Sequence, residues 1–238
     1  MSQVGRSQFL PTRWTVVLTA GRQDTSRARE ALSQLCQTYW YPLYAYARRR
    51  GHSPADAEDL TQAFFARLLA RDSLRDVDRG KGKFRSFLLA SLKHFLADEW
   101  DKSRAQKRGG GEPVVPLDAE TRYAREPAHE LTPDKLYDRQ WAMTLLDQVL
   151  ARLSAEYSAE ARTKQFETLK VFLTAGKGAI PYSEAAKQAG MSEGAAKVAV
   201  HRMRKRYREL LRDEIAQTVS DPAQVEEEIR ALFAAFGN

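Results

Sequence analysis

The sequence predicts an all-α protein with two helical domains, a flexible linker between them and a C-terminal helical extension. Apolar residues recur at helical spacing along most of the 238 residues, whereas the alternating pattern of strands is almost absent. Residues 109–133 interrupt the helical pattern with three consecutive glycines and four prolines, a composition typical of linkers. Helical spacing then returns and continues to residue 236, so we expect one domain on each side of the interruption.

Composition limits the class of partner. The net charge is +7 and 43% of the residues are hydrophobic, as in a folded globular protein. This basic balance favours a polyanionic partner, either nucleic acid or an acidic membrane surface. No apolar run approaches the ~18 residues that span a bilayer, and the N-terminus lacks the pattern of a signal peptide. The single cysteine, Cys36, excludes an intrachain disulfide and is expected in the core, which fits a reducing, cytoplasmic location.

Three helices are expected before the linker. The first covers about residues 25–50, and Pro42 either kinks it or begins a new turn. The second runs from Pro54 to about Ala70, and the third from Phe84 to about Lys107. The third helix places three aromatic side chains on its apolar face, and we expect them in the core: Phe84, Phe87 and Phe95.

A basic helix dominates the region after the linker. Residues 181–210 read PYSEAAKQAGMSEGAAKVAVHRMRKRYREL, in which a short helix over 182–189 is followed by Gly190 as its end and Ser192 as the N-cap of a second helix. The apolar face of the second helix comprises Ala196, Val200, Met203, Tyr207 and Leu210. Residues 197–208 contain no acid, which argues against an ordinary solvated face. Two helices joined by such a turn indicate a helix-turn-helix, whose second helix enters the major groove of DNA.

The polar side of this second helix is the candidate DNA-binding surface. Residues near its N-terminus reach base edges, whereas cations further along reach phosphates. The candidate residues are Ser192, Glu193, Ala195, Lys197, Val198, His201, Arg202, Arg204, Lys205 and Arg208. Each phosphate contact is expected to steepen the log–log salt dependence of binding by about 0.9.

Residues 181–210 resemble region 4 of bacterial RNA polymerase sigma factors of the sigma-70 family, of the extracytoplasmic-function (ECF) type. In that family the second helix recognises the promoter −35 element. Residues 53–69, SPADAEDLTQAFFARLL, are similar to regions 2.1–2.2, and residues 79–111 are similar to regions 2.3–2.4. Ala185 and Ala186 stand where the family commonly has bulkier aliphatic residues, which changes packing more than recognition. No region 3 lies between the two domains, as is characteristic of the ECF group, and the resemblance implies a linker that threads toward the RNA-exit path.

The resemblance implies core RNA polymerase and promoter DNA as partners, with region 2 on the β′ clamp helices and region 4 on the β flap. It leaves open a further regulator such as an anti-sigma factor. The implied polymerase-binding residues are Asp56, Glu58, Asp59, Leu60, Gln62 and Phe65. Ser53, Pro54 and Asp56 equally mark an ordinary helix start, because Ser caps the first turn and acids there favour the helix dipole. The two interpretations are compatible if Asp56 caps the helix while Glu58 and Asp59 face outward.

Regions 2.3–2.4 of the family melt and hold the promoter −10 element. Holding a separated strand requires aromatic platforms for unpaired bases and cations along the backbone. The implied −10 residues are Lys81, Lys83, Arg85, Lys93, Trp100, Lys102, Arg104, Lys107 and Arg108. Trp100 fits the apolar face of its helix less regularly than the three phenylalanines, so it is the aromatic candidate for stacking.

No catalytic or metal-binding pattern stands out in the sequence. The glycines of GKGK and AGKGA do not fit a phosphate-binding loop, and the four histidines are scattered without cysteine partners at ligand spacing. We therefore expect no enzyme activity, no cofactor and no bound metal.

The chain ends extend beyond the pattern of a minimal family member. The predicted division is an N-terminal extension at 1–27, a region 2 domain at 28–108, a linker at 109–134, a region 4 domain at 135–218 and a C-terminal amphipathic helix at 219–238. In the N-terminal extension, Trp14, Val16, Val17 and Leu18 are expected to pack on the first domain. The C-terminal helix is expected to pack on the second, and the alternatives are that it binds a partner or controls access to DNA.

The resemblance thus predicts a transcription initiation factor that binds core RNA polymerase and directs it to promoters with −10 and −35 elements. Two alternatives remain. One is a stand-alone helix-turn-helix regulator whose N-terminal helices serve dimerisation or sensing. The other is an inactive sigma relative that antagonises another sigma factor. Polymerase binding distinguishes the initiation factor from the stand-alone regulator. Competition in a reconstituted transcription assay distinguishes the antagonist from the initiation factor.

Overall fold

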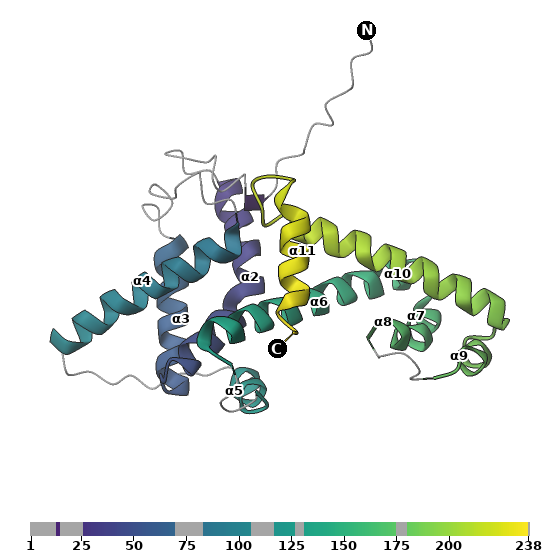
Figure 1. Cartoon of the computed structure of the whole chain (residues 1–238), viewed down its shortest axis with the longest axis horizontal. Coiled ribbons are helices and arrows are strands. Elements are labelled where there is room, and N and C mark those ends of the chain that lie inside the picture. The colour runs from purple at the N-terminus through teal and green to yellow at the C-terminus, as the bar shows by residue number, and fades with distance from the viewer. Residues whose placement is uncertain are drawn as a thin grey trace, which may run out of the picture. The chain divides into compact units, whose positions relative to one another are not determined.

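The described part of the chain is helical, which confirms the all-α prediction. The computed structural model describes residues 13–14, 26–69, 83–105, 117–126, 131–174 and 180–237. Within these residues there is no strand, only one isolated β-bridge between Lys83 and Val219 (Figure 1). In the same residues no helix has the length and apolar character needed to cross a bilayer.

The chain forms two compact units. The first contains residues 1–144 together with 215–238, and the second contains residues 145–214. The helices α6 (Pro133–Ala159) and α10 (Glu193–Ala216) contribute to both units. The two units do not end at the predicted domain boundaries, residues 108 and 134. Those boundaries separate the expected functional regions 2 and 4, and they stay predictions.

The first unit is built on three helices that the sequence predicts almost to the residue. They are α2 (Ser26–Arg49), α3 (Pro54–Leu69) and α4 (Phe84–Ala105). Pro42 lies inside α2, which continues through it. The unit is completed by α5 (Leu117–Ala124), the beginning of α6 and α11 (Gln224–Ala234).

An aromatic cluster forms the core of the first unit. The ring of Phe84 lies 4.9 Å from Trp14 and 5.1 Å from Tyr39, and Trp14 lies 5.2 Å from Phe87. The predicted core positions Phe84, Phe87 and Phe95 are all buried, as is Cys36. Burial also raises the pKa of the Cys36 thiol to about 12, so this side chain stays protonated and acts as a small apolar group.

The helix α5 corrects the prediction of a wholly flexible linker, because it packs against α2. The hydroxyl of Tyr44 donates to Glu120 Oε2 at 2.8 Å, and Arg48 pairs with Glu120 at 3.3 Å. The guanidinium of Arg122 lies 3.8 Å above the ring of Tyr41. Apolar contacts join the same cluster, which includes Ala57, Ala119 and Leu136. The glycines and prolines on both sides of α5 are typical of a linker, so the sequence pattern does not predict this short amphipathic helix.

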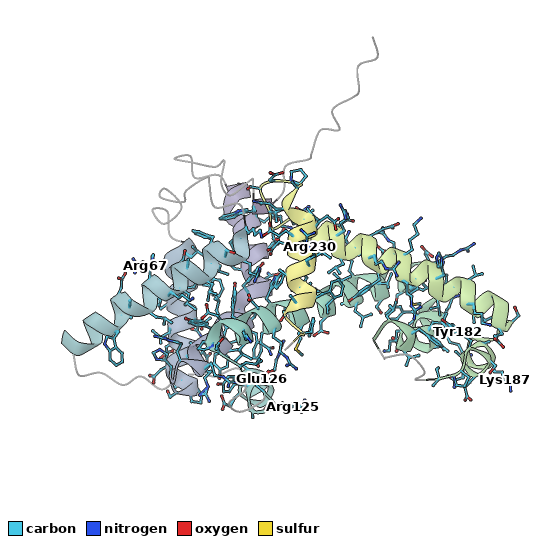
Figure 2. All side chains as sticks on the ribbon, viewed as in Figure 1. Arg67, Arg125, Glu126, Tyr182, Lys187 and Arg230 are labelled. Atoms are coloured by element: carbon cyan, nitrogen blue, oxygen red, sulfur yellow. The ribbon has the colours of Figure 1, made fainter. Side chains whose placement is uncertain are left out.

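The second unit combines the rest of α6 with α7 (Thr163–Leu169), α8 (Val171–Thr174), α9 (Tyr182–Ala189) and most of α10. Figure 1 shows α7, α8 and α9 gathered beside the first half of α10, and Figure 2 places Tyr182 and Lys187 on α9. The buried apolar residues of this unit include Val149, Leu153, Phe166, Leu169, Ala185, Ala186, Val200, Met203 and Leu210.

The C-terminal segment belongs to the first unit, so the prediction that it packs on the second domain is wrong. The amide of Phe84 donates to the carbonyl of Thr218 at 2.9 Å, and the amide of Trp14 donates to that of Gln217 at 3.0 Å. Trp14 is fully buried there, which confirms its predicted packing on the first domain. Val16, Val17 and Leu18 lie outside the described residues. Main-chain pairing between distant segments leaves no periodic signal, so this placement could not be predicted from the residue pattern.

Candidate nucleic-acid interface

The turn between α9 and α10 forms as the sequence predicts. Gly190 ends α9 in the left-handed conformation, with φ of 69°, which glycine adopts without strain. Ser192 caps α10, because its Oγ accepts a hydrogen bond from the amide of Ala195 at 3.2 Å. The carbonyl of Ser192 accepts the amide of Ala196 at 2.9 Å. The turn therefore fixes the direction in which α10 begins.

The predicted apolar face of α10 is turned into the second unit. Ala196, Val200, Met203 and Leu210 are buried, and the half-buried Tyr207 donates its hydroxyl to the carbonyl of Leu146 at 3.2 Å. The candidate DNA-binding residues are all exposed: Ser192, Glu193, Ala195, Lys197, Val198, His201, Arg202, Arg204, Lys205 and Arg208. The structure therefore gathers the ten candidates on the solvent side of one helix.

The cations of α10 differ in their partners. Arg204 donates to the carbonyl of Phe172 through Nε at 3.3 Å and Nη2 at 2.9 Å, so it ties α10 to α8. Lys197 pairs with Glu193 at 2.7 Å on the helix surface. Among the described residues, Arg202 and Lys205 make no ion pair or side-chain hydrogen bond, and the same holds for Arg208 within that part of the chain. These three cations are best placed to contact phosphates.

The acidic start of α3 divides into residues that build the helix and residues that face solvent. The amide of Asp56 donates to Ser53 Oγ at 3.1 Å, and that hydroxyl donates to Asp56 Oδ2 at 2.7 Å, so Asp56 belongs to the helix cap. Asp59 and Gln62 are exposed. Leu60 is half-buried and Phe65 is buried.

Glu58 does not face outward, which corrects the expectation that it lies beside Asp59 in solvent. It is 1% exposed, and its Oε1 accepts a hydrogen bond from Gln62 at 2.8 Å. Burial, followed by the nearby charge of Asp59, raises the pKa of the Glu58 carboxyl above its ordinary value. The cause is helix geometry: residues 57, 58, 61 and 65 follow the inward face of α3, and all four are buried.

Two candidate −10 cations at the start of α4 are already paired with carboxylates. Lys83 lies 2.7 Å from Glu227 and 3.3 Å from Glu228. Arg85 contacts both carboxylate oxygens of Glu228, through Nε at 3.1 Å and Nη2 at 3.2 Å. Arg85 also pairs with Asp138 and lies 4.5 Å from the ring of Trp141. Burial alone would lower the pKa of Arg85, but the hydrogen bonds and charge of Glu228 raise it above its ordinary value.

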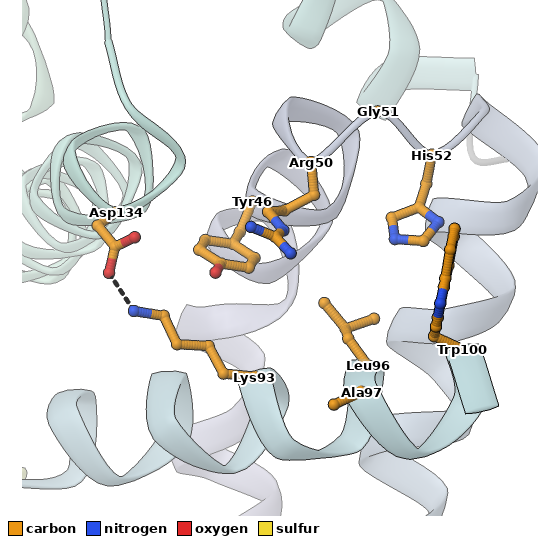
Figure 3. Close-up of a pocket in the computed structure, with 9 residues that line it drawn as sticks. All are labelled: Tyr46, Arg50, Gly51, His52, Lys93, Leu96, Ala97, Trp100 and Asp134. Atoms are coloured by element: carbon orange, nitrogen blue, oxygen red, sulfur yellow. Dashed lines mark hydrogen bonds and ion pairs between the residues drawn. The ribbon is translucent and has the colours of Figure 1, made fainter.

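Lys93 and Trp100, the other two −10 candidates whose side chains are described, line a hollow beside the second half of α4 (Figure 3). The hollow has a volume of about 780 Å³. Its lining residues are Tyr46, Arg50, Gly51, His52, Lys93, Leu96, Ala97, Trp100 and Asp134. Trp100 is 61% exposed, and Lys93 pairs with Asp134 across the opening. An exposed indole with cations around it has the chemistry that binds unpaired bases and phosphates.

Sequence reasoning missed Arg50 and His52 as members of this site. They follow α2 in the chain and lie far in sequence from α4, and the basic run RRRGH at 48–52 is the signal that points to them. Burial lowers the pKa of His52, which favours its neutral form. Lys102 and Arg104 belong to the last turn of α4, outside the side chains that are described. Lys81, Lys107 and Arg108 lie outside the described residues.

The comparisons with known proteins agree with this geometry. Residues 35–106 match the family described as Sigma-70 region 2, a range that spans most of α2, all of α3 and α4. The match covers less than half of the chain, and it shows that these helices are similar to sigma-70 region 2. Neither the search of curated proteins nor that of solved structures gave a match.

Proposed function

We propose that this chain is an initiation factor of the ECF type, which binds core RNA polymerase and directs it to promoters by their −10 and −35 elements. The observation that carries the proposal is the region 2 match over residues 35–106. The exposed basic side of α10, held by a capped turn, supports it from the other end of the chain.

Polymerase binding is assigned to the solvent side of α3. Asp59 and Gln62 are exposed there, with Leu60 half-buried between them. Asp56 and Glu58 instead hold the helix together, through the cap and through the buried bond to Gln62. The β′ clamp helices are the expected contact of this surface, and the β flap is the expected contact of the second unit.

The −10 element is assigned to the hollow beside α4. An unpaired base that stacks on Trp100 would gain roughly 1–3 kcal/mol, and Arg50 would hold an adjoining phosphate. Lys93 would hold a second phosphate once that phosphate replaces Asp134 as its partner. The −35 element is assigned to α10. Ala195 and Val198 are exposed near its N-terminus, where a small apolar side chain can contact a thymine methyl group.

Size-exclusion chromatography with bacterial core RNA polymerase tests the proposal. Asp59→Lys tests the surface most directly, because Asp59 is exposed and its charge can be reversed without disturbing the core. Glu58→Lys would instead place a lysine in a buried position. We expect the wild-type chain to co-elute with the polymerase and Asp59→Lys to elute separately. Glu160→Lys, which reverses the charge of an exposed residue just after α6, is the matched control and should co-elute. Separate elution of the wild-type chain would contradict the proposal and favour a stand-alone regulator.

A further inference from the structure

The C-terminal clasp, defined as residues 217–234, is anchored to the beginning of α4. Its main chain bonds to Trp14 and Phe84, and Val219 forms a β-bridge with Lys83. The clasp then turns into α11, where Val225 and Leu232 are buried. Main-chain bonds and apolar contacts thus hold the clasp where α4 begins, beside the first cations of the region 2 match.

Two carboxylates of the clasp, Glu227 and Glu228, form ion pairs with Lys83 and Arg85. Glu228 is 1% exposed and faces Lys83 and Arg85, whose side chains are only 18% and 14% exposed. Glu227 adds a second carboxylate to Lys83, and the hydrogen bond from that lysine lowers the pKa of Glu227. Asp138 of α6 takes a remaining donor of Arg85. Each of the two cations is therefore paired with two carboxylates.

A carboxylate that accepts two parallel bonds from a guanidinium stands where a phosphate would bind. Arginine uses the same fork of donors for both groups, so a bidentate carboxylate and a phosphate exclude one another. Because Glu228 bridges Arg85 and Lys83, one side chain of the clasp occupies two cations to which the resemblance to regions 2.3–2.4 gives a role at the −10 strand.

We infer that the clasp competes with single-stranded promoter DNA for Lys83 and Arg85. This inference rests on the proposed function and adds a regulatory contact to it. With the clasp closed, the hollow around Trp100 remains open to a base, but the cations at the start of α4 do not contribute to strand binding. Strand binding at full strength requires Glu228 to leave.

Fluorescence anisotropy with a labelled single-stranded oligonucleotide, titrated at several KCl concentrations, tests the competition in the full chain. Glu228→Gln keeps the shape of the side chain and removes its charge. We expect this variant to bind several-fold more tightly than the wild type. Its log–log salt slope should be steeper by up to about 1.4, since each phosphate neutralised on a single strand adds about 0.7.

Two further variants control the measurement. Glu227→Gln loses only the exposed partner of Lys83, so it should show a smaller change in the same direction. Glu160→Gln makes the same change of net charge in the second unit and should bind as the wild type does. Far-UV circular dichroism confirms that each variant is folded. Hydrogen exchange gives an independent readout, since saturating oligonucleotide should increase amide exchange over residues 224–234 of the wild type.

The outcomes separate the competition from the proposed function. The competition alone is overturned if the wild type and Glu228→Gln bind the oligonucleotide equally tightly and the oligonucleotide does not change amide exchange over residues 224–234. Tighter binding by Glu160→Gln to the same extent also overturns it, because net charge would then explain the effect. An oligonucleotide that binds no variant overturns both the competition and the −10 assignment.

Discussion

At the scale of single residues, Glu58 and Asp59 are neighbours in the chain with opposite environments. Successive helix positions differ by about 100° in direction, so one carboxyl enters the core while the next faces solvent. The buried one is bonded to Gln62, and its Oε2 atom has no hydrogen-bond partner among the described residues. A carboxyl in such a site is stabilised in its protonated form.

Glu58 should therefore make stability depend on pH in a defined direction. Its folded pKa is raised above the unfolded value of about 4.3, so the folded state binds more protons between the two values. The stability that this group contributes is present below the unfolded pKa and is lost as pH rises through the folded pKa. We expect the Tm of the wild type, relative to that of Glu58→Gln, to fall as pH rises from the acid range to neutrality. Each kcal/mol lost from the free energy of unfolding should lower the Tm by about 2–4 °C. Calorimetric melts of both proteins across this range measure the difference, and a relative Tm that rises with pH would show a depressed pKa instead.

At the scale of elements, the basic helix α10 assigns its arginines to two tasks. Arg204 is bonded to the carbonyl of Phe172, and Arg206 pairs with Glu156 at 2.7 Å. Both therefore hold α10 against other helices of the second unit. Arg202 lies on the exposed side, without an ion pair or side-chain hydrogen bond in the described part of the chain. The basic run in the sequence is thus partly structural.

We expect the variants Arg202→Gln and Arg204→Gln to differ in kind. Arg202→Gln should lower the salt slope for double-stranded DNA by about 0.9, with a Tm within about 2 °C of the wild type. Arg204→Gln should lower the Tm of the second unit by more than Arg202→Gln does, because the carbonyl of Phe172 loses two donors. Anisotropy titrations and thermal melts of both variants make the comparison. An equal loss of salt slope with no loss of Tm for Arg204→Gln would show that both arginines contact phosphates.

The elements that sequence reasoning located well are those with local signals. Ser53 and Pro54 mark the start of α3, and Gly190 and Ser192 mark the turn before α10. These caps depend on residues three or four positions away, so the sequence contains them in full. The helix α5 was missed because its main contact joins Glu120 to Arg48, which lie far apart in the chain. Arg50 and His52 were likewise missed because the α4 residues beside them are distant in the chain, and so was the pairing of Arg85 with Glu228.

At the scale of the whole molecule, the first unit takes its core from segments spread along the chain. Trp14 comes from the N-terminal segment, Tyr39 from α2 and Phe84 from α4, while Tyr137 and Trp141 come from α6. Each of these side chains is at most 1% exposed. The region 2 match covers only residues 35–106, so this core extends beyond the matched residues on both sides.

A fragment of residues 28–108 should therefore fail to fold cooperatively, although it contains the whole region 2 match. It lacks Trp14, Tyr137 and Trp141, and the loss of one large buried aromatic side chain costs about 3–5 kcal/mol, against a total stability of about 5–15 kcal/mol. Far-UV circular dichroism should show a broad thermal transition for the fragment and a sharp one for the full chain.

In the full chain, Trp14→Ala isolates one of these losses and should lower the Tm of the first unit by about 10 °C. Trp14→Phe keeps an aromatic ring against Phe84 and Phe87 and should lose much less. A fragment that melts as sharply as the full chain, at the same temperature, would show that residues 28–108 are an autonomous domain. The contacts of Trp14 and α6 would then serve to position the two chain ends on that domain, and the clasp would be a separable attachment to it.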